Sequence, residues 1–394
     1  SIRGHDLSWQ GKTPSEVFAD LRAHGRDPDQ TIVQINHPRN STLGYFNQYF
    51  VDADTAVPTP ASGLRAVFAP YGDEFALDEF SYDFDALELL TGKFLGEIHS
   101  GRAPNPLPPG PYPDPQPVAG EIIRDGNGQA VFPGVVDTWF SMLNRGLRPT
   151  GVGSSDSHSA FDEPGYARTY LAVPADEVGS FSEQDLVRAI AEHRAVVSNG
   201  PLITMAIDDA TIGDELRATD EDITVDVGVR WPQWCAPNRL NLWVNGVVVD
   251  GADLDPTSGA FDGTFALTVS QDSWVVVEVT GAMNLFPVVV PAEYQSPEFS
   301  ELIGALASTF DLSALSAYGT LAPPLRRIVT PYAITNPIWV NVDGGDWVPP
   351  EAPLARRAAK PTSLREAFMR LRDLQQLPSD LAGEASAASR AGTR

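Results

Sequence analysis

The sequence predicts a mixed α/β chain, in which an α/β part is followed by an antiparallel β-sandwich. In the first half, short aliphatic and β-branched runs alternate with segments that carry helix signals, as in folds built from strands and helices. Beyond about residue 205, apolar residues alternate with polar ones, which is the period-2 pattern of half-buried strands. Turn signals rich in glycine, proline and asparagine separate these runs.

The first half, residues 1–205, opens with a clear helix start. Thr13 is followed by Pro14 and Glu16, which supply an N-cap, a proline in the first turn and a capping-box glutamate. Gly25 supplies the stop signal. A second helix signal begins at Ser182. Buried parallel strands are predicted for residues 31–36, 84–90 and 151–154, and a proline-rich surface insert for residues 103–119.

The second half divides into a sandwich and a tail. In residues 206–345, Ile223, Val225, Val227 and Val229 alternate with polar residues, and the dipeptide at 245–246, Asn-Gly, is a strong hairpin signal. Residues 346–394 predict one amphipathic helix followed by a disordered end rich in alanine, serine and glycine.

Composition narrows the possible partners. With 27 basic and 52 acidic residues the net charge is −25, which repels nucleic acid and anionic membrane surfaces. No apolar run approaches the ~20 residues of a membrane-spanning helix. The single cysteine, Cys235, excludes an intramolecular disulfide and a thiolate metal cluster within this sequence.

Two motifs at the ends of predicted strands carry candidate chemistry. In Gly-Ser-Ser-Asp-Ser-His, residues 153–158, side chains at i and i+2 point the same way, so Asp156 and His158 can converge as an oxygen and a nitrogen ligand. His37 follows the strand at 31–36 and precedes a stiffening Pro38. Either motif alone is more often a capped turn or a chance match. Together, at the ends of separate strands, they favour a metal site.

The order of these segments resembles that of PHP-domain metal-dependent hydrolases, in particular the carbaryl-hydrolase-like branch. The residues that carry the resemblance span most of residues 1–345: 36–39 (Asn-His-Pro-Arg), 84–88 (Phe-Asp-Ala-Leu-Glu), 153–158, 198–201 (Ser-Asn-Gly-Pro) and 335–339 (Thr-Asn-Pro-Ile-Trp). The resemblance implies a distorted β/α barrel with zinc, manganese or iron at one mouth. His37 would match a late histidine ligand, and Asp156 with His158 the last ligand pair. Metal-bound water, with its pKa lowered toward ~7, would be the nucleophile, and Asp156 would bridge or orient it.

The sequence departs from the family pattern at its start, because nothing before His37 supplies the family's H-x-H pair. We therefore expect an N-terminally truncated fragment, the C-terminal part of the barrel, which would bind metal poorly or lack activity. His5 is a candidate remnant ligand. Arg39 could clamp a substrate phosphate or carboxylate, with a surface ion pair as the alternative. His99 and His193 are expected to be solvated.

These observations favour a hydrolase acting on a small phosphoester, ester or carbamate through metal-activated water. The alternative is a non-catalytic extracellular protein that binds a glycan or protein through the sandwich, with Trp231 and Trp234 stacking on sugars. Tryptophans of this kind more often fill a sandwich core. An acidic chain with an appended β-rich part suits an exported bacterial protein better than a cytoplasmic one. Oligomeric state does not follow from the sequence.

Overall fold

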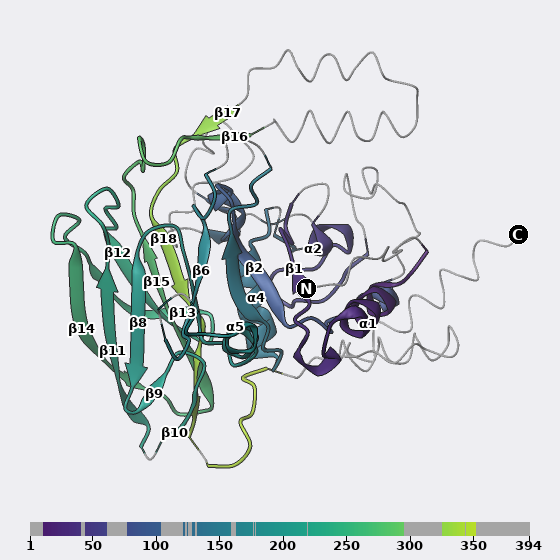
Figure 1. Cartoon of the computed structure of the whole chain (residues 1–394). Coiled ribbons are helices and arrows are strands. Elements are labelled where there is room, and N and C mark those ends of the chain that lie inside the picture. The colour runs from purple at the N-terminus through teal and green to yellow at the C-terminus, as the bar shows by residue number, and fades with distance from the viewer. Residues whose placement is uncertain are drawn as a thin grey trace, which may run out of the picture.

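The structure is a computed structural model in which the chain is a mixed α/β protein, mostly sheet with few helices (Figure 1). It describes residues 11–40, 44–60, 77–103, 121–122, 124, 128–130, 132–158, 163–175, 177, 179–218, 220–294, 325–342 and 344–351. His5, nearly all of the proline-rich insert and the expected C-terminal helix lie outside the described residues.

A three-stranded parallel sheet forms the part predicted to be α/β. Its order is β1 (Gln34–Ile35), β2 (Ala86–Thr91), β5 (Thr150–Ser154), and both neighbouring pairs are parallel. The three strands fall on the segments for which the sequence predicts them. A closed β/α barrel is not seen among the described residues, so the finer expectation of a PHP-type barrel stays a prediction.

Helices begin where their capping residues place them. Thr13 and Glu16 form the predicted capping box of α1 (Pro14–His24), and Gly25 is its C-cap. Ser182 caps α5 (Glu183–Ala191) in the same way. The other helical elements are α2 (Tyr45–Gln48), α4 (Val135–Asn144) and the short 3₁₀ helices η1 (Pro28–Gln30), η3 (Leu77–Glu79) and η4 (Leu95–Glu97).

The largest sheet has eight strands and is mainly antiparallel. Its main path is β10-β19-β15-β18-β7-β6, with β12 paired to β15 and β13 paired to β12; only β10 and β19 pair in parallel. We call it the central sheet. Its strands are β6 (Arg168–Leu171), β7 (Ala195–Ser198), β10 (Glu215–Arg217), β12 (Arg239–Val244), β13 (Val247–Asp253), β15 (Ser273–Thr280), β18 (Tyr332–Thr335) and β19 (Ile338–Asn341).

A second antiparallel sheet has the order β14-β11-β8-β9. It is built from β8 (Leu202–Ile207), β9 (Ala210–Thr211), β11 (Asp222–Arg230) and β14 (Ala260–Thr268). Two further sheets have two strands each: β3 (Arg102–Ala103) with β4 (Glu121–Ile122), and β16 (Ala292–Tyr294) with β17 (Leu325–Arg327). Burial alternates along β11, as its period-2 pattern predicts, whereas every residue of β15 is buried. The middle of the central sheet is therefore covered on both faces, whereas β13 at its edge is largely exposed.

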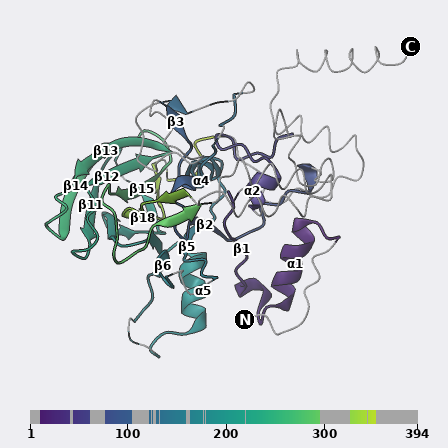
Figure 2. The ribbon, with the colours of Figure 1, turned by 90° about the horizontal axis from the view of Figure 1, so that it is seen from above.

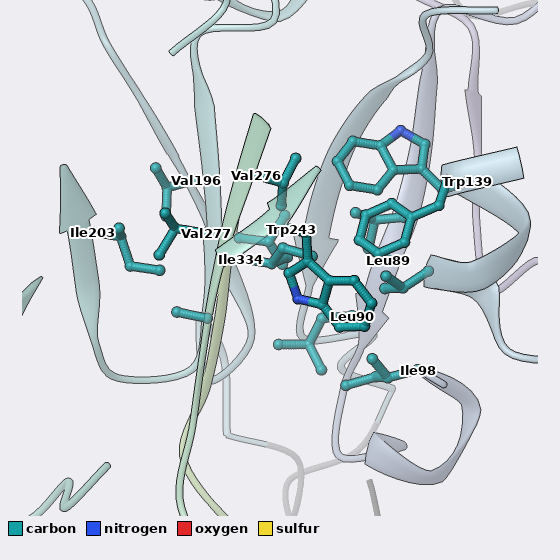
Figure 3. Packing of buried hydrophobic residues seen from close by; sticks show 14 of the residues in the cluster. Leu89, Leu90, Ile98, Trp139, Val196, Ile203, Trp243, Val276, Val277 and Ile334 are labelled. Atoms are coloured by element: carbon teal, nitrogen blue, oxygen red, sulfur yellow. The ribbon is translucent and has the colours of Figure 1, made fainter. Parts of the chain in front are cut away.

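A continuous apolar core joins the layers. Val276 and Val277 of β15 lie between Ile203 of β8 on one side and Leu90 of β2 with Trp139 of α4 on the other (Figure 3). Seen from above, α1 lies across the parallel sheet from the antiparallel sheets (Figure 2). The parallel sheet is thus packed between helices and the central sheet.

Asn336 fixes the parallel sheet against the central sheet. Its buried amide accepts a hydrogen bond from the Gly151 N–H (2.7 Å) and donates to the carbonyl oxygens of Gly151 and Ala195 (2.9 Å each). The side chain therefore bridges the backbones of β5 and β7, which do not pair with each other directly. It holds β5, the strand that ends at the candidate site, in place.

The expected boundary at residue 205 falls inside β8, and β6 and β7, which precede it, pair within the central sheet. How the chain divides into domains stays a prediction. Among the described helices, none combines the length and the apolar character required to cross a membrane.

Candidate functional site

The carboxyl end of the parallel sheet gathers side chains around Glu88. Parallel strands end at the same sheet edge, and such edges are where α/β folds place their ligands. The His37 N–H, beyond β1, donates to one oxygen of Glu88, and the Ser154 hydroxyl, at the end of β5, donates to the other. The register of β2 against β5 shifts after Glu88. Irregularities of this kind are common next to functional sites. One carboxylate on β2 thus joins the segment beyond β1 to the end of β5.

Glu88 is 1% exposed, so its carboxyl group is almost completely removed from water. Burial raises the pKa of Glu88, and the negative charge of Asp156 raises it further. Hydrogen bonds from Ser154, His37 and Thr91 only partly offset this. Asp156 therefore lies near enough to act on Glu88, as the predicted convergence of strand ends requires.

The backbone is strained at two of the predicted ligands. His37 has φ 31° and Asp156 has φ 46°, both in the left-handed region that non-glycine residues rarely adopt. Each such residue costs on the order of 1 kcal/mol or more, and strain of this kind clusters at functional sites. The two residues follow β1 and β5, the strands on either side of β2.

The strain at Asp156 leads to a prediction. Asp156→Gly should be more stable than Asp156→Ala by about 0.5–1 kcal/mol, because glycine adopts positive φ without a Cβ clash. Both variants lose the same carboxylate, so the difference reports the backbone alone. Urea unfolding measures it, and the same pair at Asp20 in α1 is the control, where alanine should be the more stable. If the alanine variant is more stable than the glycine variant at position 156, as it should be at position 20, the backbone at Asp156 is unstrained.

The predicted metal ligands are only partly brought together. Asp156 and His158 do converge, with His158 Nε2 2.9 Å from Asp156 Oδ1, but 80% of the His158 side chain is exposed. His37 Nδ1 is buried and has no hydrogen-bond partner among the described residues, as a ligand nitrogen would before binding. Within the described part of the chain, however, no three histidine, cysteine or carboxylate side chains form a group that could hold a metal ion. The donor chemistry suits a metal, but the arrangement does not assemble a centre, and no catalytic step through one follows from it.

Arg39 is buried, 3% exposed, so the alternative of a surface ion pair is wrong. Its guanidinium donates to the Thr138 hydroxyl on α4 and to Asn47 Oδ1 (3.4 Å), and it lies over the Phe46 ring at 5.4 Å. These contacts anchor the loop beyond β1 to α2 and α4. A direct contact of Arg39 with substrate stays a prediction.

Glu97, in η4, has a shifted pKa that the sequence did not predict. Burial, reinforced by the negative charge of Glu88 and only partly offset by Arg39, raises the pKa of Glu97 to about 8. A carboxylic acid held largely protonated at neutral pH can donate a proton to a leaving group. Its spacing in the sequence carries no signal, because its partners lie on other elements.

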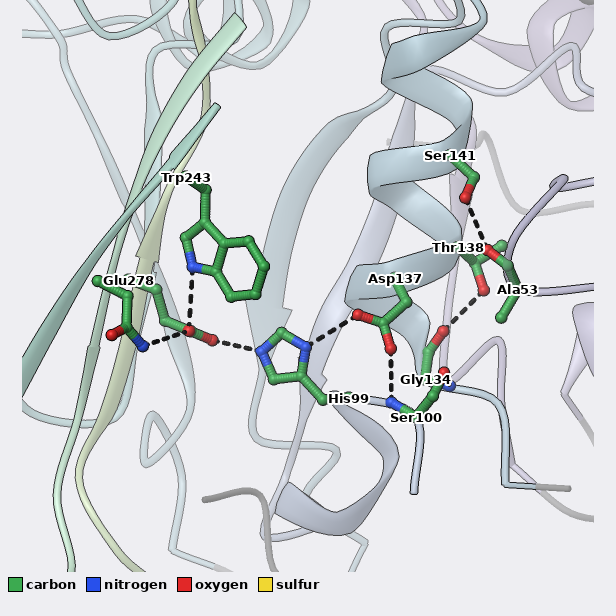
Figure 4. A network of polar contacts seen from close by, with 10 residues as sticks. Ala53, His99, Ser100, Gly134, Asp137, Thr138, Ser141, Trp243 and Glu278 are labelled. Carbon is green, nitrogen blue, oxygen red and sulfur yellow. Dashed lines mark hydrogen bonds and ion pairs between the residues drawn. The ribbon is translucent and has the colours of Figure 1, made fainter. Parts of the chain in front are cut away.

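His99 is buried, and His193 is only partly exposed and makes specific contacts, so the expectation that both are solvated is wrong. His193 Nδ1 bonds the Thr150 hydroxyl (2.7 Å), and its ring meets Trp339 edge-on. His99 is 7% exposed and lies between Asp137 and Glu278, which are 38 and 179 residues away in sequence (Figure 4). Local sequence could not reveal partners at such separations.

The tryptophans proposed for sugar stacking give little support to the binding alternative. Trp231 is 6% exposed, and its indole N–H donates to Pro256 O (3.2 Å). Trp234 is 38% exposed. Because Trp243, Trp274 and Trp339 are also buried, the tryptophans of these strands mainly fill the core.

A comparison with protein-family models found no match, and comparisons with curated proteins and with solved structures found none either. Fold and site together define a sheet-rich α/β protein with strained polar residues at the carboxyl edge of a parallel sheet. Its relationship to PHP-domain hydrolases stays a prediction from sequence.

Proposed function

We propose that the chain is a metal-dependent hydrolase of PHP type, with a distorted β/α barrel fold and its reaction site at the carboxyl edge of β1-β2-β5. The supporting observation is that His37 and Asp156, two predicted ligands, are the strained residues on either side of Glu88. Residues held in this backbone region cluster at functional sites.

The donors assigned to zinc, manganese or iron are His37, Asp156 and His158, with His5 as a further candidate outside the described residues. Imidazole nitrogens and a carboxylate suit these ions. The substrate class is a small phosphoester, ester or carbamate. In each, departure of an alkoxide or an amine is assisted by a proton at the leaving oxygen or nitrogen, and Glu97, with its raised pKa, is the proposed donor.

Metal content is the first test. If His37, Asp156 and His158 hold an ion in this chain, protein purified without chelator will carry zinc, manganese or iron above background by plasma mass spectrometry. The double variant His37→Ala, Asp156→Ala should lose it. The control replaces the same residue types at exposed positions, His24→Ala with Asp29→Ala, and should keep it. Equal metal in all three proteins would contradict the proposed site.

Substrate class is then decided by hydrolysis of matched alkyl phosphate, alkyl ester and alkyl carbamate probes, whose leaving groups depart poorly unless they are protonated. Glu97→Gln should lower the rate on the accepted probe and remove the alkaline limb of its pH profile without changing metal content. Loss of metal in Glu97→Gln would assign this residue to the metal site instead.

A further inference from the structure

His99 joins α4 to the central sheet with a carboxylate at each ring nitrogen. Nδ1 lies 3.1 Å from Asp137 Oδ1 on α4, and Nε2 lies 2.5 Å from Glu278 Oε1 on β15 (Figure 4). The ring stacks on Trp243, with 5.6 Å between centroids. Glu278 is fully buried, so water does not screen this contact. We call His99, Asp137 and Glu278 the His99 clamp.

The hydrogen bonds of the clamp require a charged ring. A neutral imidazole has one N–H donor, whereas an imidazolium has two. The second oxygen of Glu278 accepts from Trp243 Nε1 (3.2 Å) and Asn241 Nδ2 (3.4 Å), and that of Asp137 accepts from the Ser100 N–H (2.6 Å). These donors stabilise both carboxylates in the ionised form. The ring must therefore donate from both nitrogens.

The remaining groups around the clamp agree with this assignment. Asp137 lies in the first turn of α4, where the helix dipole favours negative charge. The Tyr332 hydroxyl on β18 also faces the clamp, and burial together with the charge of Glu278 raises its pKa well above the ordinary value, so it stays neutral. Among the described residues, two negative charges thus surround one positive charge.

The clamp is connected to the loop that carries His37. Thr138, next to Asp137, accepts a hydrogen bond from Arg39. The loop is closed by the Asn40 N–H on His37 O (2.9 Å) and the Phe46 N–H on Pro38 O (3.0 Å). The start of α4 thus holds both the clamp and the loop beyond β1.

We propose that His99 is a clamp that is charged at neutral pH, and a positioning residue. Its imidazolium fixes the start of α4 to the central sheet, and through Thr138 and Arg39 it holds the His37 loop in its strained conformation. Loss of the charge, at high pH or by substitution, releases the loop. This inference does not depend on metal binding or hydrolysis.

The charge is tested by ¹⁵N NMR of histidine-labelled protein. At pH 7–9 the His99 ring should show two protonated nitrogens, identified by their disappearance in His99→Gln. Free histidine in the same buffers is the reference and is neutral over most of this range. A His99 ring with one protonated nitrogen at pH 7 would overturn the proposal.

The coupling to the loop is tested by hydrogen exchange at the Asn40 and Phe46 amides. His99→Gln should speed their exchange about tenfold or more. Ser141→Ala is the control, because it removes a neutral bond to Ala53 O (2.7 Å) from the same helix. If His99→Gln does not fold, Asp137→Asn removes one arm of the clamp and should act in the same direction. Unchanged exchange in the folded clamp variants would overturn the coupling, whatever metal the protein binds.

Discussion

Trp274→Ala should lower the free energy of unfolding by about 3–5 kcal/mol, one of the two largest single-residue effects that we expect. Trp274 is fully buried on β15, and its ring centroid lies 4.9 Å from that of Phe140 on α4. Its indole N–H donates to Asn144 Oδ1 (2.8 Å). Alanine would leave a cavity between helix and sheet and an amide without this donor.

Urea unfolding followed by far-UV circular dichroism measures the loss, and Trp234→Ala is the matched control. Because Trp234 is 38% exposed, its removal should cost about 1 kcal/mol or less. The comparison tests whether α4 and the central sheet share one core. A loss at Trp274 no larger than at Trp234 would mean that these layers are stabilised independently.

Elements with local signals could be predicted from the sequence. The capping box at Thr13 starts α1, and Asn245 and Gly246 both adopt positive φ in the turn between β12 and β13, as their residue types favour. By contrast, α4 was missed. It is buried on nearly all sides and begins at Gly134 without a side-chain cap, so it shows neither an amphipathic stripe nor a start signal.

The residues of the candidate site also differ in whether local sequence reveals them. The side chains of Asp156 and His158 contact each other, but not through the extended chain on which the prediction relied, because Asp156 has φ 46°; their role as a ligand pair stays a prediction. Glu97 and His99 were missed because their environments come from distant elements. Asn336, in one of the segments that carry the family resemblance, bonds backbone groups of β5 and β7. A shared motif residue can therefore serve the fold and not the reaction.

His99→Ala should destabilise the protein by about 3–5 kcal/mol, because it leaves Glu278 buried without its counter-charge. The exposed His24→Ala is the control, with an expected change within about 0.5 kcal/mol. The sign of a second substitution makes the test sharper. Glu278→Gln should destabilise the wild-type protein, since it removes a partner of the imidazolium. In the His99→Ala background it should restore stability, since it removes an unpaired buried charge.

The difference in unfolding free energy between wild type and His99→Ala should depend on pH if it has an electrostatic origin. Burial lowers the pKa of His99, but the carboxylates of Glu278 and Asp137 outweigh this effect and raise the pKa to about 10. A pKa raised by folding adds stability that is complete below the unfolded value of about 6.5 and is lost as the pH rises through the folded value. The stability gap between wild type and His99→Ala should therefore be widest near pH 6 and narrow toward pH 10. A gap that is constant over this range would assign the loss to packing against Trp243 and not to charge.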